Sequence, residues 1–324
     1  MIKVGMIGCG GISRGHVAGW QTVDSQKARV VATADIDEAA AKERAEALGA
    51  EDVYDDYLRL LDRDDIDAVD ICLPHPLHME STVAAAKHGK HVLCEKPIAR
   101  DLEEAQRMID VCKEHGRILQ IGHQNRFSPE FMRYKELLGE LDLGKINLVQ
   151  SRWEFWPNLR PFHYKKDAIG GGTLISCGIH TADLARWFWG DVKTVAFMGN
   201  SFTRGMEGED VAALLLEFAD GPVGTLIMSW ACKFGKNTWF SSQGPNGALE
   251  VERGKPVVQT SEDGATEYPA TVDVPAMGGQ KQHFVECIAE GKTPLVSGEE
   301  GYKALQIALA AYESMETGRI IDIA

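Results

Sequence analysis

The sequence predicts an α/β protein in two parts, a doubly wound parallel sheet followed by an α+β domain whose sheet is mostly antiparallel. The chain has 324 residues, which is about the length of two domains. Residues 1–121 alternate apolar runs with helical segments, a pattern typical of a parallel sheet covered on both faces. After Gly122, strand-like runs follow one another on short turns, which indicates antiparallel pairing. We therefore expect one domain at 1–121 and a second at 122–324.

The first part reads as alternating strands and helices. The expected strands are 2–7, 28–34, 68–73, 91–94 and 117–121. The expected helices are 16–23, 37–48, 80–88 and 102–115, and a glycine follows each of the last three, as is common at helix ends. Right-handed crossovers between parallel strands then give a doubly wound sheet.

The second part has a different order of elements. A helix is expected at 130–138, a strand at 147–156 and a long amphipathic helix at 173–189. Further strands are expected at 195–198, 211–218, 223–230 and 248–252, with turns at Asp220-Gly221 and Pro245-Asn246-Gly247. Helices at 280–289 and 299–317 follow the last of these strands. Strands and helices in separate runs indicate an α+β domain.

The composition disfavours several classes of function. Lys and Arg total 34 against 48 Asp and Glu, and the net charge of −14 disfavours binding to nucleic-acid phosphates or anionic membranes. The chain runs straight into its first strand, so we expect no signal peptide, and no apolar run reaches the roughly 18 residues of a membrane span. The seven cysteines have no metal-binding spacing. We predict a reduced, cytoplasmic protein without a bound metal.

A glycine-rich turn precedes the first expected helix. Gly8-Cys9-Gly10-Gly11-Ile12-Ser13 follows the first strand, where backbone N–H groups at a helix N-terminus can approach a pyrophosphate. Ser13 stands where the dinucleotide fingerprint has its third glycine. The candidate dinucleotide contacts are Gly8, Gly10, Gly11 and Ile12. The alternative is a glycine-rich turn that holds no ligand.

Asp35 ends the second expected strand and is the candidate for cofactor discrimination. A carboxylate at this point accepts hydrogen bonds from a ribose 2′-hydroxyl and repels a 2′-phosphate. No Arg or Lys is adjacent to Asp35 in the sequence. We therefore predict NAD in preference to NADP. The alternative is that Asp35 only caps the helix that begins near Glu38.

Polar residues also follow the third, fourth and fifth expected strands. In an open α/β sheet, ligands bind outside the carboxyl ends of the strands. We expect cofactor contacts from Pro74, His78, Glu95, Lys96 and Gln124, and substrate contacts from Lys96 and Arg126. The alternatives are ordinary loop polarity for the histidine and an exposed ion pair for Glu95 with Lys96.

A run of three glycines, 170–172, precedes the long helix expected in the second part. Ser176, His180 and Asp183 follow at helical spacings of four and three, so they share one helix face. The glycines permit close backbone approach to another surface. Taken alone, His180 also fits a hydrogen-bonded core histidine.

Together these residues resemble the Gfo/Idh/MocA family of nicotinamide-dependent sugar and polyol dehydrogenases. The resemblance covers essentially the whole chain. It is carried by Gly8-Cys9-Gly10, by Pro74 with His78, by Gly89-Lys90-His91-Val92-Leu93-Cys94-Glu95-Lys96-Pro97, by 170–172 with His180 and Asp183, and by Ser297-Gly298-Glu299-Glu300-Gly301. It implies a Rossmann domain, an open-faced second sheet that builds homodimers or homotetramers, and bound NAD(H) or NADP(H).

The resemblance also implies roles for single residues. Lys96 matches the family's active-site lysine, and the Lys96-Pro97 peptide is often cis in such proteins. His180 matches the catalytic histidine. Ser176 stands where many members have an Asp that binds substrate or relays protons. This departure points to a different substrate or to weakened catalysis.

We expect hydride transfer between a nicotinamide cofactor and a sugar, polyol or inositol-like substrate. His180 would take the hydroxyl proton, and Lys96 would donate a hydrogen bond that offsets the developing negative charge. Aromatic faces and polar edges suit a sugar, so the expected substrate contacts also include Trp153, Trp156, Arg160, His163, Tyr164, Ser176 and His180. For the aromatic segment, ordinary packing is the alternative. Two other classes stay open, a non-catalytic dinucleotide-binding regulator and an NAD-dependent glycosidase that oxidises its substrate transiently.

Overall fold

The computed structural model describes residues 1–323, apart from the side chain of Ala168, and these residues form two compact units. Unit 1 contains Met1–Phe127 and Val274–Tyr302. Unit 2 contains Ser128–Asp273 and the described residues from Lys303 onward. The sequence places 274–302 in the second domain, whereas the structure groups this segment with the N-terminal residues.

Helix α9 (Ala276–Glu290) explains why this late segment belongs to unit 1. It packs on α1 (Ser13–Trp20) so closely that a Cβ at Gly19 would lie 2.8 Å from the carbonyl oxygen of Met277. Phe284 of α9 is buried in the same core cluster as Val4 and Trp20. The apolar face of α9 is therefore part of the core of unit 1.

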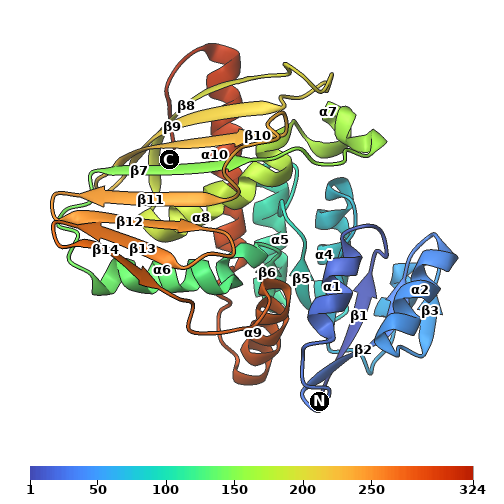
Figure 1. Cartoon of the computed structure of the whole chain (residues 1–324). Helices are drawn as coiled ribbons and strands as arrows, with labels where there is room; N and C mark the ends of the chain where they lie inside the picture. Colours follow the sequence, from blue (N-terminus) through green and yellow to red (C-terminus); the bar gives the residue numbers. More distant parts are fainter. Residues whose placement is uncertain (324) are drawn as a thin grey trace. The chain divides into compact units, whose positions relative to one another are not determined.

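The sheet of unit 1 is parallel and doubly wound, with the strand order β3-β2-β1-β4-β5-β6 (Figure 1). Its strands are β1 (Ile2–Ile7), β2 (Ala28–Ala34), β3 (Asp52–Tyr54), β4 (Ala68–Ile71), β5 (His91–Cys94) and β6 (Leu119–Ile121). Its further helices are α2 (Glu38–Leu48), α3 (Tyr57–Leu61), α4 (His78–Lys87) and α5 (Leu102–Glu114), with short turns η1 (His75–Leu77) and η2 (Gln124–Phe127). All strand pairs are parallel, so the carboxyl ends of the strands meet at one edge.

The sequence prediction misses two elements of unit 1, β3 and α3. They have three and five residues, which is too short for a hydrophobic period to be read. Helix α1 also begins at Ser13, earlier than the expected start at residue 16. The Ser13 hydroxyl donates to the carbonyl of Gly10 (2.6 Å) and accepts a bond from Arg44 Nε (2.9 Å), which holds the first turn of the helix.

Unit 2 contains a nine-stranded sheet in the order β14-β13-β12-β11-β7-β10-β9-β8-β15 (Figure 1). Its strands are β7 (Leu148–Glu154), β8 (Val192–Asn200), β9 (Val211–Phe218), β10 (Val223–Ser229), β11 (Trp239–Gly244), β12 (Gly247–Glu252), β13 (Val257–Ser261), β14 (Gly264–Tyr268) and β15 (Ile321–Asp322). The other elements are α6 (Pro129–Glu140), η3 (Pro161–Tyr164), α7 (Lys166–Ile169), η4 (Leu174–Gly178) and α8 (Ile179–Trp189). Helix α10 (Gly298–Thr317) contributes residues to both units.

The mostly antiparallel pairing predicted for this sheet is confirmed, and the one parallel pair joins β7 to β10. Strands β11, β13, β14 and β15 were not predicted. Strand β11 was not predicted because the polar pair Ser241-Ser242 reads as loop sequence, although both residues are buried in the strand. Tyr134 and Trp189, both distant in sequence, place their polar atoms 2.6 and 2.8 Å from the Ser242 hydroxyl and satisfy it.

The prediction of one amphipathic helix over 173–189 is wrong in two respects. The segment begins with a π-helical turn, η4, and the α-helix α8 starts only at Ile179. Helix α8 is also buried on nearly all sides. Ten of its eleven residues are buried. Among them, Phe188 packs against Phe131 of α6 and Phe240 of β11, with ring centroids 6.3 and 5.2 Å apart.

Two further features of the described chain are the state of its cysteines and the hydropathy of its helices. All seven cysteines are free, and six of them are buried. Among the described residues, no helix combines the length and the apolar character that crossing a bilayer requires.

Candidate active site

The glycine-rich turn connects β1 to α1 in unit 1. Gly8 has a φ of +89°, and a Cβ there would lie 2.8 Å from the backbone of Cys72, so the turn is open only to glycine. Gly10, Gly11 and Ile12 are exposed at the start of the helix. An exposed backbone at a helix N-terminus fits the pyrophosphate of a dinucleotide.

Asp35 lies half-buried just after β2 and faces this turn. Its carboxylate accepts hydrogen bonds from the backbone N–H of Cys9 (2.6 Å) and of Asp37 (2.8 Å). The cap of α2 is a different residue, Asp37, whose side chain accepts from the N–H groups of Ala39 and Ala40. The capping role considered for Asp35 therefore belongs to Asp37.

Pro74 and His78 follow β4. His78 is fully buried, and its two ring nitrogens each lie 2.8 Å from a carbonyl oxygen, one of Pro97 and one of Leu73. Burial lowers the pKa of this imidazole. His78 therefore joins the loop after β4 to the loop after β5, and it supports these loops from inside.

Glu95 and Lys96 follow β5, and the Lys96–Pro97 peptide is cis. Lys96 is half-buried, whereas Glu95 is 4% exposed and accepts from the backbone N–H of Lys96 (3.2 Å). Burial would raise the pKa of Glu95, but the hydrogen bond and charge of His16, with the charges of Lys96 and Lys281, lower it to about 2. Glu95 is therefore an ionised, buried carboxylate and not an exposed ion-pair partner.

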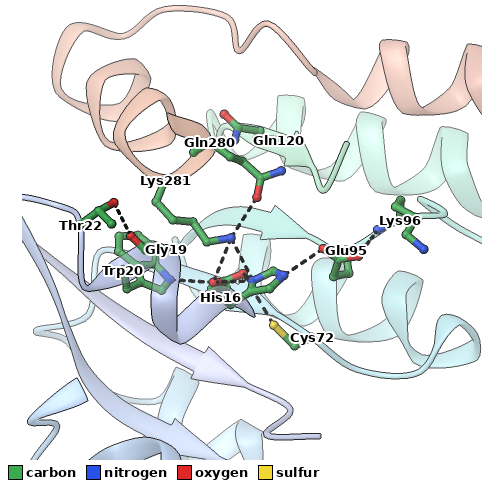
Figure 2. A network of polar contacts seen from close by, with 11 residues as sticks. His16, Gly19, Trp20, Thr22, Cys72, Glu95, Lys96, Gln120, Gln280 and Lys281 are labelled. Carbon is green, nitrogen blue, oxygen red and sulfur yellow. Dashed lines mark hydrogen bonds and ion pairs between the residues drawn. The ribbon is translucent and has the colours of Figure 1, made fainter. Parts of the chain in front are cut away.

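Figure 2 shows the buried polar network around Glu95, which the sequence reasoning missed. His16 of α1 lies between two carboxylates, with Nε2 2.9 Å from Glu95 and Nδ1 2.9 Å from both oxygens of Asp70. Trp20 Nε1 donates to Asp70 (2.7 Å), and Lys281 Nζ lies 3.6 Å from the same carboxylate. One signal was available, since Asp70 is a lone carboxylate inside an apolar strand and buried charges need partners.

Cys72, His16 and Asp70 bring potential metal-ligand atoms within 4.8 Å of one another. The ammonium of Lys281 already occupies this neighbourhood, with Nζ 2.9 Å from His16 Nδ1. A cation is thus supplied by the chain itself, and the cluster fits a side-chain network better than a metal centre.

Gln124 and Arg126 lie on η2, directly after β6. Gln124 is half-buried. Arg126 is only 1% exposed, forms an ion pair with Glu300 (2.8 Å) and donates to the carbonyl of Leu295 (3.2 Å). The structure thus places Arg126 as a link between η2 and the late segment of unit 1.

In unit 2, the glycine run packs tightly against the segment that precedes β9. A Cβ at Gly172 would lie 2.2 Å from the carbonyl oxygen of Glu209, and one at Gly171 would lie 2.2 Å from the hydroxyl of Tyr312. The Glu209 carboxylate accepts from the backbone N–H of Leu174 (2.8 Å) and from the Tyr312 hydroxyl (3.1 Å). The glycines therefore permit close approach, as expected, and the residues approached are Glu209 and Tyr312, which the sequence reasoning missed.

His180 lies in the first turn of α8, directly after the π-helical turn. It is 4% exposed, and its ring centroid lies 6.2 Å from that of Trp153 on β7. Asp183 is fully buried one turn further along, and Ser176 is half-buried within η4. The regular spacing assumed for these residues thus holds for His180 and Asp183, whereas Ser176 belongs to a wider turn.

The predicted aromatic and polar contacts of unit 2 differ in the side chains that they touch. Trp153 stacks on Phe155 beside His180. Trp156 is 40% exposed, but the guanidinium carbon of Arg204 lies 4.1 Å and Lys233 Nζ 4.8 Å from its ring centroid. The backbone N–H of Arg160 donates to His163 Nδ1 (2.9 Å), and the His163 ring lies 5.6 Å from that of Trp230. Tyr164, like Trp153, packs against the buried cluster that contains Trp230.

Two family models match successive parts of the chain. A family model described as "Oxidoreductase family, NAD-binding Rossmann fold" matches residues 2–123, and one described as "GFO/IDH/MocA C-terminal domain" matches residues 131–250. The chain is 28% identical to a D-apiose dehydrogenase of Paraburkholderia graminis, over 99% of this chain and 89% of that protein. It is 29% identical to a myo-inositol 2-dehydrogenase of Thermotoga maritima, over 99% of this chain and 98% of that protein.

A solved structure agrees over the same extent. An oxidoreductase from Agrobacterium radiobacter, in complex with NAD+, L-tartaric acid and magnesium, superposes with a TM-score of 0.92 at 25% identity, covering 99% of this chain and 98% of that chain. The fold and the glycine-rich turn define a Rossmann-fold oxidoreductase that uses a nicotinamide cofactor. Within that class, the chain belongs to the Gfo/Idh/MocA family.

Proposed function

We propose that the protein transfers a hydride between a nicotinamide cofactor and a hydroxyl-bearing carbon of a sugar, polyol or inositol-like substrate. The observation that carries the proposal is the common edge of the parallel sheet. The glycine-rich turn, Pro74, Lys96 and Gln124 follow β1, β4, β5 and β6, which are neighbours in the order of the sheet. Ligands of open α/β sheets bind at this edge. The names of the D-apiose and myo-inositol dehydrogenases support the substrate class.

In the proposed reaction, Lys96 and His180 act on the same substrate oxygen. The bound nicotinamide supplies the hydride acceptor. The His180 imidazole takes the hydroxyl proton, because a neutral imidazole titrates near working pH. The Lys96 ammonium donates a hydrogen bond to the oxygen and offsets its developing negative charge. Lys96 is half-buried and partly desolvated, which strengthens such a bond.

The proposed cofactor is NAD rather than NADP. Asp35 supports this preference because its carboxylate is free of the helix cap and lies against the glycine-rich turn through Cys9. A 2′-hydroxyl suits this carboxylate, and a 2′-phosphate is repelled by it. Gly10, Gly11 and Ile12 are the proposed pyrophosphate contacts, with Pro74, Glu95 and Gln124 at the same sheet edge.

The proposed substrate contacts in unit 2 centre on His180. Trp153 supports this assignment because its ring lies beside that of His180. Ser176, His163 and Tyr164 complete the proposed set. The ring of Trp156 is already engaged by Arg204 and Lys233, and Arg126 by Glu300, so their placement favours structural support over direct substrate binding.

We also propose that copies of the chain associate through the sheet of unit 2. Strand pairing places Met198, Ala213 and Ile227 in one row across β8, β9 and β10. The next row carries Leu215, which is 51% exposed, and Met198 is 82% exposed. Exposed apolar side chains gathered on a sheet favour self-association. The free thiols are consistent with the reducing cytoplasm, which is the proposed location.

The test is an absorbance assay of nicotinamide reduction with a panel of polyols, aldoses and inositols, each with NAD and with NADP. We expect turnover of at least one substrate and a higher kcat/KM with NAD. Cofactor binding without turnover of any panel member would contradict the proposal and indicate a dinucleotide-binding regulator. Release of free sugar from a glycoside without net cofactor consumption would instead indicate a glycosidase.

A further inference from the structure

Four charged side chains meet in the interior of unit 1, and each comes from a different segment. His16 lies on α1, Asp70 on β4, Glu95 directly after β5, and Lys281 on α9. His16, Asp70 and Lys281 are 0% exposed, and Glu95 is 4% exposed. Charges that are so fully removed from water must be balanced by one another.

The geometry determines the charge of His16. Its Nδ1 lies 2.9 Å from both oxygens of Asp70, and its Nε2 lies 2.9 Å from Glu95 Oε1. An ionised carboxylate only accepts hydrogen bonds, so the two carboxylates favour a hydrogen on each ring nitrogen and hence an imidazolium. Lys281 Nζ also lies 2.9 Å from Nδ1 and its charge opposes that of the ring, so in this form the ammonium is held by Asp70 and Gln280 and not by the ring. Burial is the largest single effect and lowers the pKa of His16, but the charges of Asp70 and Cys72 and the hydrogen bond to Asp70 together raise this pKa well above its ordinary value.

Lys281 makes the charge balance complete. Its Nζ donates to Gln280 Oε1 (3.0 Å) and lies 3.6 Å from Asp70 Oδ2. Figure 2 shows the Lys281 side chain reaching toward the His16 ring. The network then holds two cations, His16 and Lys281, against two anions, Asp70 and Glu95. Without Lys281, two buried carboxylates would share a single cation.

The network ends at Lys96. Glu95 accepts from the backbone N–H of Lys96, and the positive charge of Lys96 helps to lower the pKa of Glu95. Gly122, after β6, leaves room for this carboxylate, because a Cβ there would lie 2.7 Å from Glu95 Oε1. A negative charge fixed beside Lys96 attracts its ammonium group and helps to hold in place the donor that faces a developing oxyanion.

We propose that Lys281 is a positioning residue for the reaction: together with His16 and Asp70, it keeps Glu95 ionised and oriented beside Lys96. The inference rests on the proposed role of Lys96. It assigns a function to a residue 265 positions away from His16 in the sequence. The competing explanation is that Lys281 only anchors α9 to the rest of unit 1.

Several titratable or charged side chains surround the network and can contribute to a pH profile. They are His16, Asp70, Cys72, His78, Cys94, Glu95, Lys96 and Lys281.

The test compares pH profiles of kcat for the full-length enzyme and three variants. Lys281→Met leaves the network with one excess negative charge, which raises the pKa of its carboxylates. We expect the acid limb of the profile to move about one pH unit upward because the carboxylates protonate more readily. At neutral pH, far above this limb, we expect kcat to fall about tenfold for a separate reason, the poorer orientation of Glu95 beside Lys96, with little change in KM. The double variant Asp70→Asn/Lys281→Met removes one charge of each sign and is expected to restore the wild-type limb within about twofold in kcat.

Lys90→Met is the matched control. Lys90 is also a buried lysine of unit 1, but its Nζ donates to the carbonyls of Arg63 and Ile66 instead of a carboxylate. Its loss is expected to lower the melting temperature and to leave the pH profile in place. A Lys281→Met profile that superimposes on the wild type, or a double variant no better than the single one, would overturn the proposal.

Two further variants, Asp70→Asn and Lys96→Met, complete the test. If Lys281→Met does not fold, Asp70→Asn alone is used, and its excess positive charge is expected to move the alkaline limb to lower pH; an unmoved limb would contradict the proposal. Lys96→Met distinguishes the proposed role of Lys96 from that of Lys281. If Lys96→Met keeps full turnover, the proposed function of Lys96 itself is wrong, whereas an inactive Lys96→Met with unmoved network profiles rejects only the role of Lys281.

Discussion

The carboxylate of Asp35 accepts a 2.6 Å hydrogen bond from the backbone N–H of Cys9. This bond joins the end of β2 to the glycine-rich turn after β1, two neighbouring strands of the parallel sheet. The two elements that would hold the pyrophosphate and the adenosine ribose of a dinucleotide are thus fixed to each other before any ligand binds. Asp35 is consequently both a structural support of the turn and the proposed discriminator between the two cofactors.

Replacing Asp35 by Asn tests that discrimination. The amide oxygen can still accept from Cys9, but the negative charge and the hydrogen bond from the Asp37 N–H are lost. We expect the affinity for NADH to fall about tenfold and the preference over NADPH to shrink by at least that factor, as loss of a bond to a charged group implies. Fluorescence titration with both cofactors measures it. Asp101→Asn, at the N-cap of α5, serves as the control, and an unchanged ratio in Asp35→Asn would reject the assignment.

The close packing of Gly172 on Glu209 predicts a large effect of a single methyl group. Gly172→Ala would place a Cβ 2.2 Å from a backbone oxygen, and we expect a loss of about 2–4 kcal/mol in the free energy of unfolding. Gly139→Ala is the control, because Gly139 lies on an exposed face of α6 with nothing within 4 Å, and a gain of about 0.5–1 kcal/mol is expected there. Urea unfolding measures both. Equal stability of Gly172→Ala and the wild type would show that the turn can relax.

The buried carboxylate of Glu95 predicts acid sensitivity. Its pKa is lowered from 4.5 to about 2 in the folded state, so its contribution to stability is present above pH 4.5 and is lost as the pH falls toward 2. Between pH 6 and 3, the unfolding free energy of the wild type should fall more steeply than that of Glu95→Gln, with a difference on the order of 2–3 kcal/mol. The exposed Glu51, replaced by Gln, should not change the slope. Parallel slopes for wild type and Glu95→Gln would contradict the ionised state of Glu95.

The exposed apolar side chains of the second sheet predict a change of assembly. Leu215→Lys and Met198→Lys place charges on that sheet and should reduce the molar mass measured by light scattering, with the circular dichroism spectrum unchanged. Leu58→Lys provides the control, since Leu58 is 43% exposed on α3 of unit 1. A wild-type protein that is monomeric at working concentration would refute the proposed assembly.

Local patterns were sufficient for most of the fold. β1 and β2 match their predicted bounds because their residues are nearly all apolar, and glycines mark the ends of several helices. β11 was missed because Ser241 and Ser242 look like loop residues. The partners of the buried Ser242 hydroxyl, Tyr134 and Trp189, lie far away in the sequence. The π-helical turn before His180 also depends on a distant residue, Glu209, which binds the N–H of Leu174.

The residues of the candidate site also fall into those that local sequence predicts and those that depend on distant partners. The glycine-rich turn, Asp35 and Lys96 were predicted because each directly follows a strand of a recognisable parallel sheet. Lys281 was not predicted, because its partners lie on α1 and β4 and nothing in the local sequence of α9 indicates them. Asp70 was the one local clue, a charge inside an apolar strand.

The central claim is that Lys96 and His180 act on the same chemical step, and a double-mutant cycle on single-turnover hydride transfer tests it most directly. With the best substrate of the polyol panel, Lys96→Met and His180→Gln are each expected to slow transfer by about 100-fold or more while cofactor affinity stays within about twofold. The double variant should be no more than about tenfold slower than the worse single variant, because groups that serve one step lose their contributions together. Losses that multiply in the double variant, or a single variant that transfers hydride at the wild-type rate, would contradict the account.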